Sequence, residues 1–203
     1  MERAGGHRAL TVPLRYLALG DSYTIGTGAS GDAHAWPSIV AVRLGAELTN
    51  PAVNGYTTLD LIRDELPLVA KVDPELVTVL IGVNDLVQGR SLDAYKNSMT
   101  AIYDAVAGRR VVAVSIPTWS YVPAAADFGG AVHVDRLTGA FNQVARAEAD
   151  LRGFKWVDLG PASTSAIGSQ GWIARDRLHP GDAQYAAWAE AIWPTVRDLV
   201  EES

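Results

Sequence analysis

Short apolar runs alternate with longer amphipathic stretches along this sequence, and that alternation constrains the fold more than any other feature. The apolar runs cover residues 16–19, 48–53, 76–81, 111–116 and 156–159. The second run is weak because Asn50 and Pro51 interrupt it. Three of the runs are nearly continuous, as in strands that are buried on both faces of a parallel sheet. The sequence therefore predicts an α/β protein built around such a sheet.

The stretches between the runs place apolar residues three and four positions apart, which is the spacing of an amphipathic helix. The clearest stretches cover 36–44, 92–106, 137–145 and 185–199. We expect Gly153 to stop the third helix and Pro194 to kink the last one. A helix over 58–71 is less regular because Pro67 interrupts it. The β–α order thus repeats five times, at a spacing that suits right-handed crossovers and a doubly wound sheet.

The length of 203 residues fits one domain better than two. We expect residues 14–203 to form a single domain and residues 1–13 to form a flexible tail. The tail contains Arg3, His7 and Arg8 but no apolar segment, so it does not read as a signal peptide. This favours a cytoplasmic location, although a trimmed N-terminus would leave secretion open.

The composition excludes several classes of function. Cysteine is absent, which rules out disulfides, thiolate metal sites and a cysteine nucleophile. The formal net charge is −6 and the basic residues are scattered, so no nucleic-acid partner is expected. No apolar run approaches the ~20 residues of a membrane span. We expect no metal and no cofactor, and the sequence does not define the oligomeric state.

Small and polar residues follow four of the apolar runs, where an α/β sheet binds its ligands. The four clusters are Gly20–Tyr23, Asn54–Thr58, Gly82–Asp85 and Asp176–Pro180. Each cluster alone reads as ordinary turn residues. Because together they contain a serine, an aspartate and a histidine, they indicate a functional site.

Three residues of these clusters match the needs of nucleophilic catalysis. A serine hydroxyl such as Ser22 is a weak nucleophile until a base removes its proton, and His179 is a suitable base. Asp176 lies three residues before His179 and could accept from its Nδ1–H, leaving Nε2 free to face Ser22. Taken singly, Asp176 would be a helix N-cap and His179 a surface residue. His7, His34 and His133 are expected to be exposed or at helix ends, and they form no metal cluster.

Acyl transfer also needs hydrogen-bond donors aimed at the developing oxyanion. The backbone N–H of Ser22, the backbone at Gly55 and the side-chain amide of Asn84 are candidate donors from three strand ends. The alternative is that Gly55 and Asn84 are ordinary turn residues.

Together, the clusters resemble the sequence blocks of the GDSL, or SGNH, hydrolase family of esterases and lipases. The matching residues are Gly20-Asp21-Ser22 with Gly26 or Gly28; Asn50 and Gly55; Gly82, Asn84 and Asp85; and Asp176, His179 and Pro180. This resemblance implies a three-layer α/β/α fold with a five-stranded parallel sheet of flavodoxin-like topology. It implies a Ser22–His179–Asp176 triad and an oxyanion hole formed by Ser22, Gly55 and Asn84. Asp21 and Asp85 are interpreted as structural supports, and Tyr56 departs from the small residues common at its position.

The sequence thus predicts a serine esterase that hydrolyses lipid-type or short acyl esters or thioesters through an acyl-enzyme. Candidate substrate-binding residues in the apolar loops are Tyr56, Leu86, Trp119, Phe128, Trp172 and Ile173. Trp119 and Trp172 could instead pack their loops onto the core. Because aromatic side chains also stack on sugars, a carbohydrate O-acetyl esterase is the alternative. A remoter alternative is a non-catalytic flavodoxin-like module in which Gly20–Gly28 cradles a phosphate.

Overall fold

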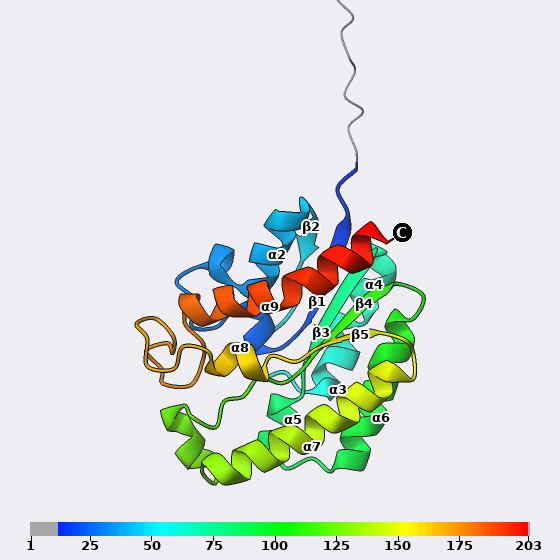
Figure 1. The fold of residues 1–203 in the computed structure, drawn as a ribbon. Helices are drawn as coiled ribbons and strands as arrows, with labels where there is room; N and C mark the ends of the chain where they lie inside the picture. Colours follow the sequence, from blue (N-terminus) through cyan, green and yellow to red (C-terminus); the bar gives the residue numbers. More distant parts are fainter. Residues whose placement is uncertain (1–11, 203) are drawn as a thin grey trace, which may run out of the picture.

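A five-stranded parallel sheet forms the centre of the protein in the computed structural model, which describes residues 12–202 (Figure 1). Most of the predicted tail 1–13 lies outside the described residues. The strands are β1 (Arg15–Gly20), β2 (Glu47–Thr49), β3 (Leu76–Leu80), β4 (Arg110–Val114) and β5 (Lys155–Val157). Their order is β2-β1-β3-β4-β5, which is the flavodoxin-like order. The predicted fold class is therefore confirmed.

Helices cover both faces of the sheet and complete the three layers (Figure 1). One layer contains α2 (Trp36–Leu44) and α9 (Asp182–Glu201), which contact each other. The other contains α6 (Leu92–Val106), α7 (Ala131–Asp150) and the segment made of α3 (Thr58–Asp60), the π-helix η2 (Leu61–Glu65) and α4 (Pro67–Val72). Short helices follow several strands: α1 (Ser22–Ile25), η1 (Asp32–His34), α5 (Val83–Val87), η3 (Pro123–Phe128) and α8 (Gly160–Thr164).

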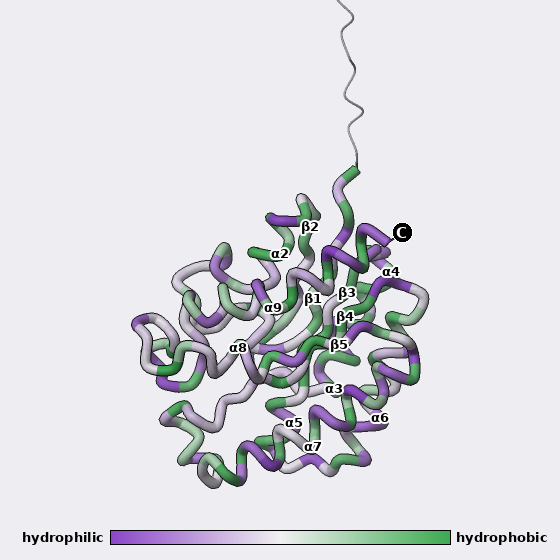
Figure 2. The backbone as a smooth tube through the Cα atoms, viewed as in Figure 1, coloured by the Kyte–Doolittle hydropathy of each residue, from purple (hydrophilic) through white to green (hydrophobic). Residues whose placement is uncertain are grey.

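The central strands make the core between these layers. All five residues of β3 are buried, and so are the last five of β1. Figure 2 shows hydrophobic residues along the central strands and hydrophilic stretches on the outer helices. The two edge strands are only three residues long, and this shortness limits the unpaired backbone that an edge exposes.

The structure differs from the sequence expectations mainly at element boundaries. Strand β2 ends at Thr49, because Pro51 lacks the N–H that a longer ladder needs. The expected helix over 58–71 contains a π-turn in which Leu66 N–H donates to Leu61 O at 3.0 Å, and Pro67 then opens α4. Helix α9 continues through Pro194 to Glu201. The short helices were not predicted, since segments of three to six residues carry too little periodicity.

Candidate active site

The turn after β1 presents Ser22 as the first residue of α1. Asp21 caps this helix, its Oδ1 accepting from Tyr23 N–H at 3.0 Å. Gly20 must be glycine, because a Cβ there would lie 2.2 Å from Thr24 Oγ1 and 2.3 Å from Leu80 O. As the first amide of the helix, Ser22 N–H has no acceptor within the helix. It therefore stays a candidate oxyanion donor.

The loop before α9 brings Asp176 and His179 together. Asp176 Oδ2 lies 2.6 Å from His179 Nδ1, and Asp176 Oδ1 accepts from the backbone N–H groups of Leu178 and His179 at 3.0 Å each. Burial acts to raise the pKa of Asp176, but these hydrogen bonds outweigh it and hold the pKa below its usual value. The carboxylate thus stays charged and orients the imidazole through Nδ1, so Nε2 is the ring nitrogen that does not contact Asp176.

Backbone contacts close this loop on itself, and Gly28 brings it close to the segment that follows Ser22. Ala174 N–H donates to His179 O at 2.8 Å, and the bridge between Ile173 and Pro180 closes the loop. Gly28, in a left-handed conformation with φ +94°, passes so close that a Cβ there would lie 2.6 Å from Pro180 O. Gly26 and Gly28 were both candidates for the glycine that follows Ser22 in the family pattern. Gly28 is the one that allows the two loops to meet.

Ser22, Asn84 and His179 line one cavity of about 60 Å³ at the carboxyl edge of the sheet. Asn84 Nδ2 donates to Tyr56 O at 2.9 Å, which holds the turn containing Gly55 beside this cavity. Gly55 itself is exposed with φ +81° and is not one of the lining residues. Its glycine is required by backbone conformation rather than by lack of space.

The carboxylate of Asp85 connects two segments that adjoin the cavity. It is fully buried, accepts from Thr58 N–H at 2.8 Å and from Thr58 Oγ1 at 2.6 Å, and pairs with Arg90 at 2.8 Å. The carboxylate therefore links the start of α3 to α5, in keeping with a supporting role.

Among the substrate-binding candidates, Trp119 and Phe128 line the 60 Å³ cavity. Their rings meet edge to face with centroids 5.5 Å apart. The other lining residues are Tyr23, Val83, Val87 and Leu178. Tyr23, Val83 and Leu178 belong to the strand-end clusters that the sequence indicates, and Val87 lies one helical turn from Asn84, but none of the four is among the six residues predicted to bind substrate.

The other four candidates lie outside this cavity lining, each for a physical reason. Tyr56 OH donates to Asp64 Oδ2 at 2.9 Å, so the side chain points to η2. Leu86 is buried in the core. Trp172 is also buried, and its indole N–H donates to Ser163 O at 3.1 Å, so it packs its loop on the core. Ile173 belongs to the bridge with Pro180 and lines a different hollow.

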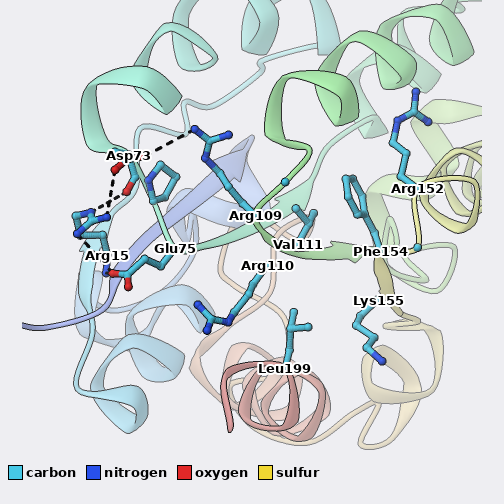
Figure 3. Close-up of a pocket in the computed structure, with 13 residues that line it drawn as sticks. Arg15, Asp73, Glu75, Arg109, Arg110, Val111, Arg152, Phe154, Lys155 and Leu199 are labelled. Atoms are coloured by element: carbon cyan, nitrogen blue, oxygen red, sulfur yellow. Dashed lines mark hydrogen bonds and ion pairs between the residues drawn. The ribbon is translucent and has the colours of Figure 1, made fainter. Parts of the chain in front are cut away.

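A larger hollow of about 820 Å³ lies at the opposite, amino end of the strands (Figure 3). Arg15, Arg110 and Lys155 begin three of the strands there. Asp73 forms ion pairs with Arg15 at 3.4 Å and with Arg109 at 3.9 Å. None of the predicted site residues lines this hollow, so the smaller cavity is the candidate active site.

Backbone hydrogen bonding in the first loop argues against a phosphate cradle. The N–H groups of residues 23–27 donate to oxygens of Asp21 or Ser22 at 2.9 to 3.1 Å. A cradle needs such amides to be free for the anion. Within residues 12–202, no cluster of three or more His, Asp or Glu side chains is placed to bind a metal ion, and no helix has the length and hydropathy to cross a membrane.

A serine, a histidine and an aspartate at the carboxyl edge of a parallel sheet, beside candidate oxyanion donors, define the class of serine hydrolases. Comparison with known protein families identifies the family to which the chain belongs. The model of the GDSL-like lipase/acylhydrolase family matches residues 18–187, so the chain belongs to this family. The resemblance found in the sequence is confirmed, and membership of this lipase/acylhydrolase family makes the chain an ester-hydrolysing enzyme.

Solved structures with the same fold have low sequence identity to this chain. A lipolytic G-D-S-L family protein from Veillonella parvula superimposes with a TM-score of 0.74 at 18% identity, covering 91% of this chain and 98% of its own. TesA gives 0.72 at 24% identity, covering 91% and 99%. A carbohydrate acetylesterase family member from Sinorhizobium meliloti gives 0.73 at 17% identity, covering 93% and 99%. Among curated proteins, no match was found.

Proposed function

We propose that the protein is a serine esterase that hydrolyses small carboxylic esters with an apolar acyl group through an acyl-enzyme. One observation carries this proposal most directly. Ser22, Asn84 and His179 line the same cavity, and Asp176 Oδ2 lies 2.6 Å from the Nδ1 of His179. A nucleophile, a base, an orienting carboxylate and an oxyanion donor are the parts that acyl transfer requires.

In the proposed reaction, Ser22 Oγ attacks the ester carbonyl while His179 Nε2 takes its proton. Asp176 stabilises the imidazolium that forms. The N–H of Ser22 and the amide of Asn84 donate hydrogen bonds to the oxyanion, and the N–H of Gly55, whose turn Asn84 holds beside the cavity, is the third proposed donor. His179 then protonates the leaving alcohol, and a water molecule activated by His179 hydrolyses the acyl-enzyme.

The size of the cavity favours a short acyl group. Its volume of about 60 Å³ is far smaller than the 820 Å³ of the hollow at the amino end of the strands. Val83, Val87 and Leu178 supply apolar walls, and Phe128 lies at its exposed side. A longer chain would have to extend past Phe128 along the surface.

The same small volume supports carbohydrate O-acetyl ester hydrolysis as a second candidate. An acetyl group fits the cavity, and a sugar ring could then stack on the exposed Phe128. Two of the similar structures are described as a carbohydrate acetylesterase family member and an acetyl xylan esterase.

A series of p-nitrophenyl esters of increasing chain length, measured beside an acetylated sugar, separates the two candidates. We expect kcat/KM to be highest for short acyl chains and to fall as the chain lengthens. Activity confined to acetyl groups on the sugar would favour the second candidate. No hydrolysis of any ester in the series would contradict both.

A further inference from the structure

Two buried carboxyl groups lie under the turn that carries Ser22, and the reaction described above does not use them. Asp21 is fully buried, and Glu65 on η2 is 1% exposed. Within residues 12–202, Asp21 Oδ2 and Glu65 Oε1 are buried without a hydrogen-bond partner. A buried, unsatisfied carboxylate oxygen is costly, so each one requires an explanation.

The other oxygen of each carboxyl group accepts from the backbone next to Ser22. Glu65 Oε2 accepts from Gly20 N–H at 2.9 Å, and Asp21 Oδ1 accepts from Tyr23 N–H at 3.0 Å. The two carboxyl groups thus hold the turn on both sides of the nucleophile.

The π-helix η2 gives Glu65 this position. It spans Leu61–Glu65 and contains one more residue than an α-helical turn, as shown by the 3.0 Å bond from Leu66 N–H to Leu61 O. Each residue rotates an α-helix by about 100°, so a regular helix would turn position 65 away from Gly20. Single π-turns of this kind often occur at functional sites.

The surroundings of the two groups disfavour two negative charges. Burial, together with the charges of Asp21 and Asp64, raises the pKa of Glu65 to about 8, although the hydrogen bond from Gly20 N–H acts to lower it. Burial, together with the charge of Asp85, raises the pKa of Asp21 to about 7, although the hydrogen bond from Tyr23 N–H acts to lower it. The charge of Asp21 also acts on three buried tyrosines, Tyr23 on α1, Tyr95 on α6 and Tyr185 on α9, and the neighbouring Asp85 has Arg90 as its cationic partner.

We propose that Asp21 and Glu65 share one proton at neutral pH and act as positioning residues for Ser22. The protonated carboxyl donates its O–H to the unpartnered oxygen of the other group, which satisfies both buried oxygens. Loss of this proton to solvent at alkaline pH leaves two repelling carboxylates, and the turn that presents Ser22 moves. The proposal rests on the proposed role of Ser22 as nucleophile.

Substitutions of Glu65 separate its hydrogen bonds from its charge. Glu65→Gln retains an acceptor for Gly20 N–H and supplies an N–H to Asp21, but it does not titrate. We expect it to retain at least about a third of the wild-type kcat at neutral pH and to abolish the alkaline fall in kcat. Glu65→Leu removes both bonds, and we expect kcat to fall by up to ~10²-fold with KM nearly unchanged, as for a small displacement of a reacting group.

A matched control is Glu148→Gln. Glu148 is also a buried glutamate, but it lies on α7 and pairs with Arg152 at 3.0 Å. Its substitution should leave the pH profile of kcat as in the wild type. The proposal is overturned if Glu65→Gln loses as much activity as Glu65→Leu, or if it keeps the wild-type alkaline decline.

An infrared titration tests the shared proton without any need for activity. In Ser22→Ala protein, we expect a protonated carboxyl band at pH 7 that is absent from Ser22→Ala/Glu65→Gln. Absence of this band from the Ser22→Ala protein overturns the shared proton even if the enzyme is an esterase. If the band is present but the wild-type protein hydrolyses no ester, the role of Ser22 is contradicted while the proton pair is supported.

Discussion

At the scale of single residues, the site depends on a few short contacts between side chains and the backbone. Asp176 uses both oxygens, one for His179 Nδ1 and one for two backbone N–H groups, so its position is fixed before any substrate binds. Asn84 is fixed by one bond to Tyr56 O. The amide has a second N–H, which is the one available to an oxyanion.

Replacement of Asn84 tests this oxyanion role. We expect Asn84→Ala to lower kcat by ~10²–10³-fold, because loss of one oxyanion donor costs about that much. The lost bond to Tyr56 O should reduce stability by only about 1 kcal/mol. Kinetics and thermal unfolding measure the two effects separately. The exposed amide variant Asn97→Ala is the control, and an Asn84→Ala enzyme with wild-type kcat would contradict the assignment.

At the scale of elements, the site depends on how closely two loops approach each other. The turn after β1 and the loop before α9 meet at Gly28, where the φ of +94° and the nearby Pro180 O exclude a side chain. Arg177, between Asp176 and His179, also has a left-handed φ of 65°, a conformation uncommon for residues other than glycine. The catalytic loop is thus held in a strained conformation by its neighbours.

A pair of glycine variants tests the loop contact. Gly28→Ala should push the loops apart and lower both the melting temperature and kcat/KM. Gly31→Ala lies in the same loop with φ 174°, and a Cβ there meets nothing within 4 Å, so it should behave like the wild type. Equal behaviour of the two variants would show that loop spacing does not matter to the reaction.

These elements also show what a sequence can and cannot predict. Continuous apolar runs predict the central strands well, because burial on both faces leaves a strong pattern. The edge strand β2 and the π-turn at Leu61–Glu65 depend on Pro51, on Pro67 and on contacts with distant residues, which periodicity does not record. The polar clusters that follow the strands indicated Ser22, Asn84 and His179, which line the same cavity. The apolar walls, such as Val83 and Val87, depend on the packing of short helices that carry no such pattern.

At the scale of the whole molecule, the buried acids should shape the dependence of stability on pH. The folded protein raises the pKa of Glu65 from 4.5 to about 8 and that of Asp21 from 3.8 to about 7. Between its unfolded and its folded pKa, each of the two groups binds more protons in the folded state than in the unfolded state. Its contribution to the free energy of unfolding is therefore fully present below the unfolded pKa and is lost as pH rises through the folded pKa. Asp176 has a lowered pKa and acts in the opposite direction, because its contribution is lost as pH falls.

Urea unfolding at a series of pH values measures this dependence. We expect the free energy of unfolding of the wild type to fall from about pH 5 to about pH 9, and Glu65→Gln to reduce that fall. A wild-type stability that rises steadily over this range would contradict the raised pKa values.

Covalent labelling of the nucleophile tests the central claim most directly. The protein is treated with a serine-directed phosphonate ester, and the adduct is located by mass spectrometry of peptides while ester hydrolysis is followed in parallel. The account predicts one adduct per chain on Ser22, with a matching loss of activity, and neither an adduct nor turnover in Ser22→Ala. Full ester hydrolysis by Ser22→Ala, or an adduct on another residue that accompanies inactivation, would contradict it.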